Sequence, residues 1–460
     1  MKLSLFALTL AGSIAATAGS VSSVPTYYKD IAPVMQNRCQ ECHRPGEVAP
    51  MSFMSYGEVR PWAKAIKTAV LTKKMPPWFA DPHVGKFSND RSLSQHEIDT
   101  LIAWIDGGAK EGDKKDAPQP RQFAEGWTIG QPDQVFQMPV AIDVPATGIV
   151  DYTYVVIPTG FTEDKWVQFA EARPDARSAM HHIIAFLRPP GSRWLKNAKP
   201  GIPYIPEGFK GRTQTGEPGQ QQGNQQGNQQ GNQRGNQQGN QQGNLDDQIP
   251  GELLVGFAPG LPPTECKPGE AKLIKAGSDI VLQLHYTPNG KATTDRSRVG
   301  LIFAKEPPQR RVMSMLAMNA FLKIPPGDAN YEARARATVP LDVNLVALTP
   351  HMHLRGKDFL YTAVYPTGER QVLLNVPHYD FNWQLSYVEN QELLLPKGTR
   401  IECVAHYDNS PNNPANPDAS KEVRWGDQTF EEMMIGFFDV SFDAKADPTP
   451  LRQRQRDPSE

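Results

Sequence analysis

The chain has 460 residues, enough for about three domains of roughly 150 residues each. Its 48 lysines and arginines stand against 50 acidic residues, so the net charge of -2 gives no sign of a nucleic-acid-binding surface. Hydrophobic residues make up only 39%, and 37 glycines with 42 prolines favour short strands and turns over a helical bundle. Four cysteines are too few for a disulfide framework.

The first 18 residues have the pattern of an export signal. Lys2 gives a positive start, a mostly apolar stretch follows, and Ala16-Thr17-Ala18 offers a small-residue cleavage site. A buried first helix is the alternative, but no polar face interrupts the apolar run. We therefore expect residues 1–18 to be removed, leaving a secreted or periplasmic protein with no transmembrane span.

Residues 25–110 have the periodicity of a small helical unit. Two helices are expected over 27–37 and 56–72, where apolar side chains recur at helical spacing. A third helix is expected to begin at Ser94, whose spacing to Glu97 is that of a capping box. The sequence thus predicts an all-α domain at this end of the chain.

After a polar linker at 111–134, the pattern changes to short strands separated by proline and glycine. Strand-like runs occur at 152–157, 183–187, 280–285, 344–348 and 401–405. Many short strands at such spacing are typical of antiparallel sandwiches or jelly rolls. The stretch is too long for one sandwich. We expect two all-β sandwich domains, at 135–310 and 311–443, followed by a polar tail at 444–460.

A low-complexity insert interrupts the first of these sandwiches. Residues 221–244 are repeats of Gln-Gln-Gly-Asn, one of which carries Arg234. The polar stretch 214–248 around them has no apolar surface to offset the entropy of ordering. We expect a disordered expansion of a surface loop rather than an interaction element.

The sequence Cys39-Gln40-Glu41-Cys42-His43 is a C-x-x-C-H motif, the attachment signature of c-type haem. Two thiols at this spacing add to the haem vinyl groups, and the adjacent imidazole becomes an axial ligand. A zinc half-site lacks a second ligand pair, and a redox C-x-x-C lacks a βαβ context. We expect one covalent haem, with His43 as its fixed ligand.

The second axial ligand is expected to be a methionine, because His/Met ligation raises the potential of an electron carrier. Met75 is the best candidate, since it lies in a proline-stiffened turn after a helix. Met51, Met54 and His83 are alternatives. The whole segment resembles a small class I cytochrome c, with a short interval between His43 and the distal candidate.

The histidines form groups. His181 and His182 are adjacent, His285 ends a strand-like run, and His351 alternates with His353. Residues i and i+2 of a strand point to one face, so the last two could chelate one ion. A lone H-x-H pair is more often structural or solvated, and it is the combination that indicates metal binding.

These segments resemble the copper type II, ascorbate-dependent monooxygenases, the family of peptidylglycine α-hydroxylating monooxygenase and dopamine β-monooxygenase. The resemblance extends loosely over 135–442. It implies two copper sites, the first with ligands His181, His182 and His285 and the second with ligands His351, His353 and Met433. Met434 is an alternative to Met433.

The donor types agree with copper. Imidazole suits copper and a thioether favours Cu(I), whereas a methionine would be an unusual ligand for zinc, the competing metal. The resemblance implies that the site with methionine is catalytic, using O2 to attack a small organic substrate, while the all-histidine copper stores an electron. Electrons would come from ascorbate, another one-electron reductant, a redox partner or the fused haem.

Some positions depart from the family pattern. Thr349 stands where the peptide-amidating enzyme has an arginine for the substrate carboxylate, and Phe437 stands where a tyrosine is expected. These departures argue against a glycine-extended peptide as substrate. Cys266 and Cys403 either pair with each other or stay free. His406 has no family role and is expected to be structural.

The sequence therefore predicts an exported haem- and copper-containing monooxygenase. One alternative is a non-catalytic periplasmic electron-transfer or copper-binding protein. A second is a binding protein that kept the sandwiches and lost the chemistry. A third is an oxidase or dehydrogenase subunit, in which haem electrons run the other way.

Overall fold

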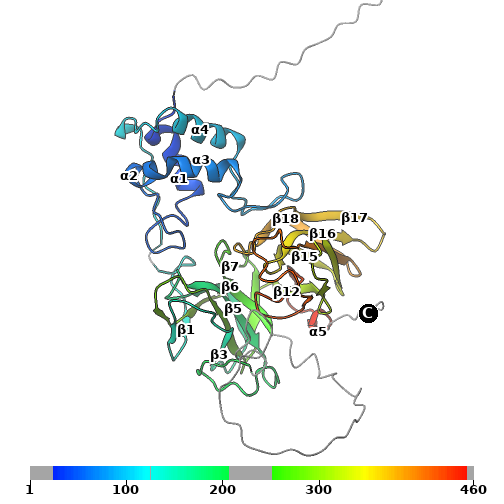
Figure 1. The fold of residues 1–460 in the computed structure, drawn as a ribbon. Coiled ribbons are helices and arrows are strands. Elements are labelled where there is room, and N and C mark those ends of the chain that lie inside the picture. The colour runs from blue at the N-terminus through cyan, green and yellow to red at the C-terminus, as the bar shows by residue number, and fades with distance from the viewer. Residues whose placement is uncertain (1–23, 125, 207–250, 453–460) are drawn as a thin grey trace, which may run out of the picture. The chain divides into compact units, whose positions relative to one another are not determined.

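The computed structural model describes residues 24–124, 126–206 and 251–452 (Figure 1). The chain divides into two compact units: Met1–Pro45, Ala49–Pro76 and Leu93–Arg121 form the first, and Gly46–Val48, Pro77–Ser92 and Gln122–Glu460 form the second. The first unit is helical and the second is built of β-sheets, which confirms a mostly β chain with few helices. The expected signal peptide and the 214–248 insert lie outside the described residues.

The helical unit contains the three expected helical regions. Its helices, in chain order, are η1 (Tyr27–Ile31), α1 (Ala32–Arg38), α2 (Tyr56–Val59), η2 (Arg60–Trp62), α3 (Ala63–Leu71), α4 (Gln95–Asp106) and η3 (Lys114–Asp116). Pro61 lacks the N–H that an α-helix needs, and the helix tightens to a 3-10 turn around it. In the described part of the chain, no helix is both long and apolar enough to cross a membrane.

The expected capping box begins α4. The hydroxyl of Ser94 accepts from the backbone N–H of Glu97 at 3.2 Å, and the Glu97 carboxylate accepts from the backbone N–H of Ser94 at 2.7 Å. These bonds satisfy amides that have no partner within the helix. The helix then buries Leu101 and Trp104 in the core of the unit, against Ile31 of η1 among others.

The first half of the β unit consists of two facing sheets. One has the strand order β3 (Thr153–Pro158), β9 (Asp279–Tyr286), β5 (Met180–Arg188) and β6 (Glu252–Phe257). The other has the order β1 (Gln134–Gln137), β11 (Arg298–Phe303), β4 (Lys165–Arg173) and β8 (Glu270–Ile274), with β7 (Thr264–Glu265) paired to β4. Their shared core includes Val167, Ile183 and Leu282, each fully buried.

The second half repeats this arrangement. One sheet has the order β12 (Arg310–Met318), β21 (Ile435–Asp443), β15 (Val343–His351) and β18 (Tyr387–Leu395). The facing sheet has the order β14 (Tyr331–Thr338), β19 (Arg400–Tyr407), β16 (Gly356–Val364) and β17 (Arg370–Val376). Alternate residues of β19 are buried, as expected for a strand with one face on a core. One of them is Cys403, and none of the four cysteines forms a disulfide.

Short elements complete the unit: β2 (Ile142–Val144) pairs with β10 (Thr293–Asp295), β13 (Lys323–Ile324) pairs with β20 (Val423–Arg424), and α5 (Thr449–Arg452) ends the described chain.

The two sandwiches share one nine-stranded sheet, because β8 pairs in parallel with β12. Arg311 of β12 also forms a buried ion pair with Glu252 of β6, at 2.8 Å. The five expected strand regions all coincide with strands of these sheets.

Residues 77–92, which we call the strap, fall within the expected 25–110 unit but pack on β18. The rings of Trp78 and Phe87 lie 4.8 and 5.4 Å from the ring of Tyr387. The side chain of Asn89 donates to the carbonyl of Ser386 at 2.7 Å and accepts from the backbone N–H of Val388 at 3.0 Å. The strap therefore extends an otherwise open sheet edge.

Candidate metal centre

A β-bulge lets the adjacent residues His181 and His182 join the same cluster. Adjacent residues of a regular strand point to opposite faces. In the pairing of β5 with β9, however, Met180 lies opposite Tyr286 and His182 opposite His285, so His181 is the extra residue. The bulge therefore reconciles an adjacent histidine pair with a single binding site, and the cross-strand partner of His182 supplies the third histidine.

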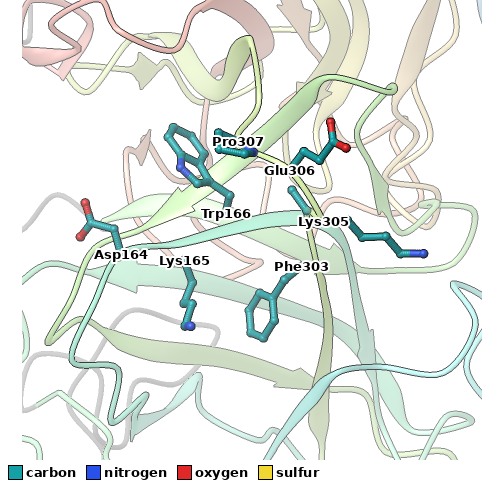
Figure 2. A pocket seen from close by; sticks show the side chains of 8 residues that line it. Asp164, Lys165, Trp166, Phe303, Lys305, Glu306 and Pro307 are labelled. Atoms are coloured by element: carbon teal, nitrogen blue, oxygen red, sulfur yellow. The ribbon is translucent and has the colours of Figure 1, made fainter.

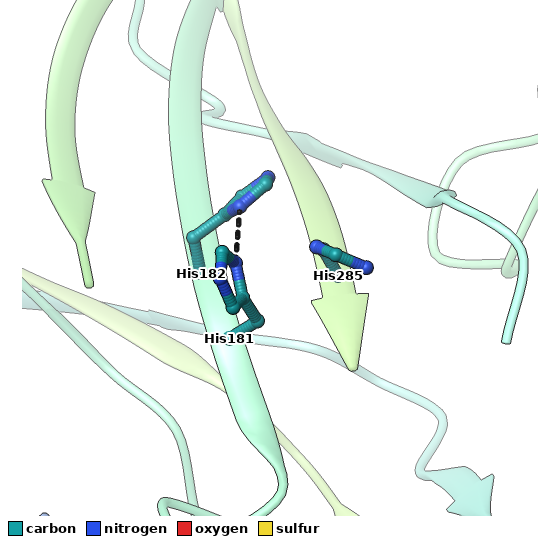
Figure 3. A group of neighbouring side chains, drawn as sticks. All are labelled: His181, His182 and His285. Carbon is teal, nitrogen blue, oxygen red and sulfur yellow. Dashed lines mark hydrogen bonds between the residues drawn. The ribbon is translucent and has the colours of Figure 1, made fainter. Parts of the chain in front are cut away.

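His181, His182 and His285 form a compact cluster, which we call the histidine triad (Figure 3). One ring nitrogen from each of the three lies within 4.8 Å of the others. The Nε2 atoms of His181 and His182 and the Nδ1 atom of His285 are buried and have no hydrogen-bond partner. A buried polar atom without a partner is costly, so the cluster suits a ligand that accepts several imidazole lone pairs.

Burial keeps these imidazoles neutral, the form that binds metal. Burial, followed by the charge of His351, lowers the pKa of His181 to about 4. Burial also holds the pKa values of His182 and His285 well below the ordinary range, with the neighbouring histidines adding to the effect. Protons therefore compete weakly for the lone pairs near neutral pH.

An aromatic side chain covers the histidine triad. Tyr152 stacks on the ring of His285, with centroids 4.4 Å apart, and lies 5.4 Å from the ring of His182. Tyr152 is buried, and burial raises the pKa of its hydroxyl well above the ordinary value. The ring therefore excludes water from one side of the cluster and remains an uncharged phenol.

The H-x-H pair lies at the end of β15. The rings of His351 and His353 are 5.2 Å apart and nearly perpendicular. The Nδ1 atom of His351 is 2.9 Å from the side-chain oxygen of Gln384, and the Nδ1 atom of His353 is 3.2 Å from the carbonyl of Glu431. Both partners accept hydrogen bonds, so each Nδ1 carries the proton. The Nε2 lone pair of His351 is then left for an ion, whereas the backbone of Gln428 forms a second hydrogen bond with His353. Such outer partners fix the tautomer in histidine metal sites.

Met433 follows two residues that contact the H-x-H pair. The carbonyl of Glu431 is 3.2 Å from the Nδ1 atom of His353, and the carboxylate of Glu432 accepts from the backbone N–H of the same histidine at 2.8 Å. Met434 is fully buried in the core of the second sandwich, whereas Met433 is half-buried. These facts favour Met433 over Met434 as a thioether donor beside the H-x-H pair.

A buried acid–base pair fixes the backbone of this second set. The carboxylate of Glu432 accepts from the backbone N–H groups of His353 at 2.8 Å and Arg355 at 2.7 Å. The guanidinium of Arg355 lies 3.9 Å from the same carboxylate and donates to Asn409 at 3.0 Å. Burial raises the pKa of Glu432 to about 8, against the opposing effect of these donors. Removing either partner would leave a buried group unsatisfied.

The C-x-x-C-H motif of the helical unit lies on one helical turn. The backbone N–H of His43 donates to the carbonyl of Cys39 at 2.9 Å, and neither cysteine forms a disulfide. The Nδ1 atom of His43 bonds the carbonyl of Met51 at 3.2 Å, and its ring stacks on Phe53 at 4.3 Å. These bonds orient the imidazole and leave its Nε2 atom to a ligand, so the residues fit a covalent haem.

The distal candidates differ in their surroundings. Met75 is half-buried in the helical unit, and its backbone N–H donates to the carbonyl of Ala69 at 3.2 Å. Met54 is exposed, and His83 belongs to the strap, where its side chain is 89% exposed. Neither fits a buried axial ligand in the helical unit, which leaves Met75 and the partly buried Met51. The pairing of Met75 with His43 stays a prediction.

A shallow surface cavity lies away from all these sets (Figure 2). It measures about 250 Å³ and is lined by residues of β4 and of the segment after β11, with charged side chains such as Asp164, Lys165 and Glu306. The cavity contains none of the predicted ligands. We assign it no role in the site.

Sequence reasoning missed four residues that surround the candidate ligands. Gln384 and Glu432 hold the second set, Tyr152 covers the first, and Phe381 contacts both. The sequence did contain one indication of the role of Glu432, because this residue directly precedes the predicted ligand Met433. Gln384 and Phe381 lie in a loop far from any histidine of the two sets in the sequence, and only the tertiary structure reveals them.

Comparisons with known proteins assign no family. No protein-family model matches the chain, and no curated protein matches it. Solved structures that align include the infectious bursal disease virus Gx strain, at 7% identity over 70% of this chain and 75% of that one, with a TM-score of 0.19. PBCV-1 VP54, fitted into a reconstruction of the virophage Sputnik, aligns at 8% identity over 71% of this chain and 100% of that one, with a TM-score of 0.21. Scores this low carry no argument.

Proposed function

We propose that the protein is an exported copper-dependent monooxygenase that hydroxylates a C–H bond of a small organic substrate. The observation that carries the proposal is the histidine triad, with its three unpartnered buried nitrogens, close to a second pair of oriented histidines. Copper at such sites would supply one-electron chemistry with O2. The resemblance to the ascorbate-dependent copper monooxygenases supports the same assignment.

The chain's own residues prepare two unequal sites. His181, His182 and His285 offer imidazole alone, in a buried and neutral state. His351 and His353 are oriented through their Nδ1 atoms, and Met433 adds a softer donor beside them. The difference in donors supports different roles, with electron storage at the first site and O2 and substrate at the second.

The surroundings of the second set support an uncharged substrate. Phe437 places its ring 6.3 Å from that of His351, and Phe381 places its ring 6.0 Å from that of His353. Thr349, two residues before the H-x-H pair, offers no positive charge to hold a carboxylate. An organic group with an apolar reacting carbon suits this lining better than a peptide carboxylate.

The helical unit is proposed to carry one c-type haem. Cys39 and Cys42 would attach it, His43 would be one axial ligand and Met75 the other. Its role would be to deliver electrons singly to the histidine triad, since copper monooxygenation consumes two electrons for each O2. Ascorbate or another one-electron reductant remains an alternative donor.

Metal content tests the copper assignment. Wild-type protein loaded with copper and desalted is expected to hold two copper ions and one haem per chain. His285→Ala should hold one copper ion, because it removes a ligand of the histidine triad alone. His406→Ala is the matched control, since His406 bonds Asp358 and is not a predicted ligand, and this variant should hold two copper ions. Equal copper in wild type and His285→Ala would refute the site.

Isotope labelling separates a monooxygenase from the alternatives. With a turned-over substrate under labelled O2, the product hydroxyl should carry the label. Label from water would indicate an oxidase or dehydrogenase. Copper uptake without O2 consumption across a panel of reductants and apolar substrates would favour a copper-binding or electron-transfer protein.

A further inference from the structure

One aromatic side chain of the β unit contacts a histidine of each metal-binding set. Phe381 lies in the loop between β17 and β18. Its ring stacks on His181 of the histidine triad, with centroids 4.7 Å apart and planes inclined by 17°. The same ring meets His353 of the second set edge-on, at 6.0 Å and 81°. Phe381 therefore lies between the two sets.

The loop that carries Phe381 is fastened to the second set. The side-chain nitrogen of Gln384 donates to the carbonyl of Phe381 at 2.8 Å, while its side-chain oxygen accepts from His351 at 2.9 Å. The hydroxyl of Tyr379 is 3.1 Å from the same Gln384 nitrogen and donates to the carbonyl of Met352 at 2.8 Å. The position of the phenyl ring is thus coupled to the position of the H-x-H pair.

The two sets are close enough to interact through space. The centroid of one phenyl ring lies 4.7 Å from that of His181 and 6.0 Å from that of His353. Two ions this near could share a bridging oxygen if nothing separated them. Phe381 offers no donor atom to either ion, and its ring occupies space between a histidine of each set.

We propose that Phe381 is a positioning residue that holds the two centres at a short, fixed separation and keeps them from merging into one bridged centre. The statement about the spacing of the copper ions rests on the proposed function. The contact geometry can be tested on metal-free protein, so the two can fail separately.

The geometric test uses NMR of histidine-labelled, metal-free protein. A ring proton stacked on a phenyl group resonates upfield, so Phe381→Ala should move the His181 signals downfield and also perturb those of His353. Phe381→Tyr keeps the ring and should restore both. Phe437→Ala is the matched control, because its ring faces His351 alone and should leave His181 unchanged. If Phe381→Ala fails to fold, Phe381→Leu removes the same ring current.

The spacing test uses EPR of the copper-loaded protein. Wild type, Phe381→Tyr and Phe437→Ala should each show two Cu(II) spins per chain, with a narrow distribution of copper–copper distances. Phe381→Ala should keep two copper ions, lose at least half of the spin intensity through coupling, and populate shorter distances. Phe381→Leu is used instead if the Phe381→Ala variant does not fold.

Unchanged His181 signals in Phe381→Ala would overturn the inference. So would a spin count and distance distribution equal to those of wild type. A wild-type protein that binds fewer than two copper ions would contradict the proposed function instead, and the NMR result alone would then decide whether Phe381 contacts both sets.

Discussion

At the scale of single residues, the tautomer of each imidazole matters as much as its presence. A histidine binds an ion only if the chosen nitrogen carries a lone pair, and the partner of the other nitrogen decides this. In the second set, Gln384 and the carbonyl of Glu431 hold the protons on Nδ1. Residues that are not themselves predicted ligands should therefore affect the affinity of the proposed site.

Replacing Gln384 should weaken the second site selectively. Gln384→Leu removes the acceptor from His351 and leaves its Nδ1 proton unpaired, so the copper affinity of this site should fall by about 10–100-fold. The histidine triad should be unaffected. Competition titration with a chelator measures both sites. Gln371→Leu, an exposed glutamine on β17, is the control, and an equal loss in both variants would contradict the assignment.

The buried imidazoles also set a pH dependence of stability. In the unfolded chain they take up protons below about pH 6.5, whereas in the folded protein the pKa is lowered to about 4 at His181 and about 3 at His353. The unfolded state therefore binds more protons, and stability present above pH 6.5 is lost as the pH falls toward 4. The slope should be about 1.4 kcal/mol per pH unit for each buried imidazole.

Denaturant unfolding of the chelator-treated protein between pH 7.5 and 5 measures this slope. His285→Gln should reduce the slope by the contribution of one imidazole, because the substitution removes a histidine whose pKa is held low. His378→Gln, at an exposed histidine, is the control. A slope equal to that of wild type in His285→Gln would show that the imidazole is protonated in the folded state.

At the scale of elements, sequence pattern predicts the strands well and their irregularities poorly. Alternating apolar residues and punctuating glycines identify the runs that become β3, β5, β9, β15 and β19. The bulge at His181 follows from the register of β5 against β9, a long-range property that local sequence does not encode. The Gln384–Phe381 loop and the strap depend in the same way on tertiary packing.

The strap gives a prediction at this scale. Asn89→Ala removes both bonds to the strand edge at β18, which should cost about 1–3 kcal/mol of local stability. Hydrogen exchange at Val388 and at the strap should accelerate, while exchange in the rest of the β unit stays unchanged. Asn412→Ala, at an exposed asparagine, is the control. Unchanged exchange at Val388 would show that the strap is held without Asn89, by its aromatic residues and by backbone bonds such as the one from Ser88 to the carbonyl of Val388.

At the scale of the whole molecule, the two units have separate hydrophobic cores. The haem motif lies in the helical unit and every copper ligand candidate lies in the β unit, so cofactor loading should be separable. The double variant Cys39→Ser with Cys42→Ser should lose covalent haem, as seen in a haemochrome spectrum, and retain two copper ions. A fall in copper content would show that the haem unit is needed to form the copper sites.

The strap also limits how the protein can be dissected. A fragment that begins after the helical unit, at residue 122, would omit Trp78 and Phe87 and leave the ring of Tyr387 uncovered at an open sheet edge. Bare edges and aromatic patches promote self-association. Aggregation of such a fragment would therefore reflect the missing cover rather than an inability of the β-sandwiches to fold.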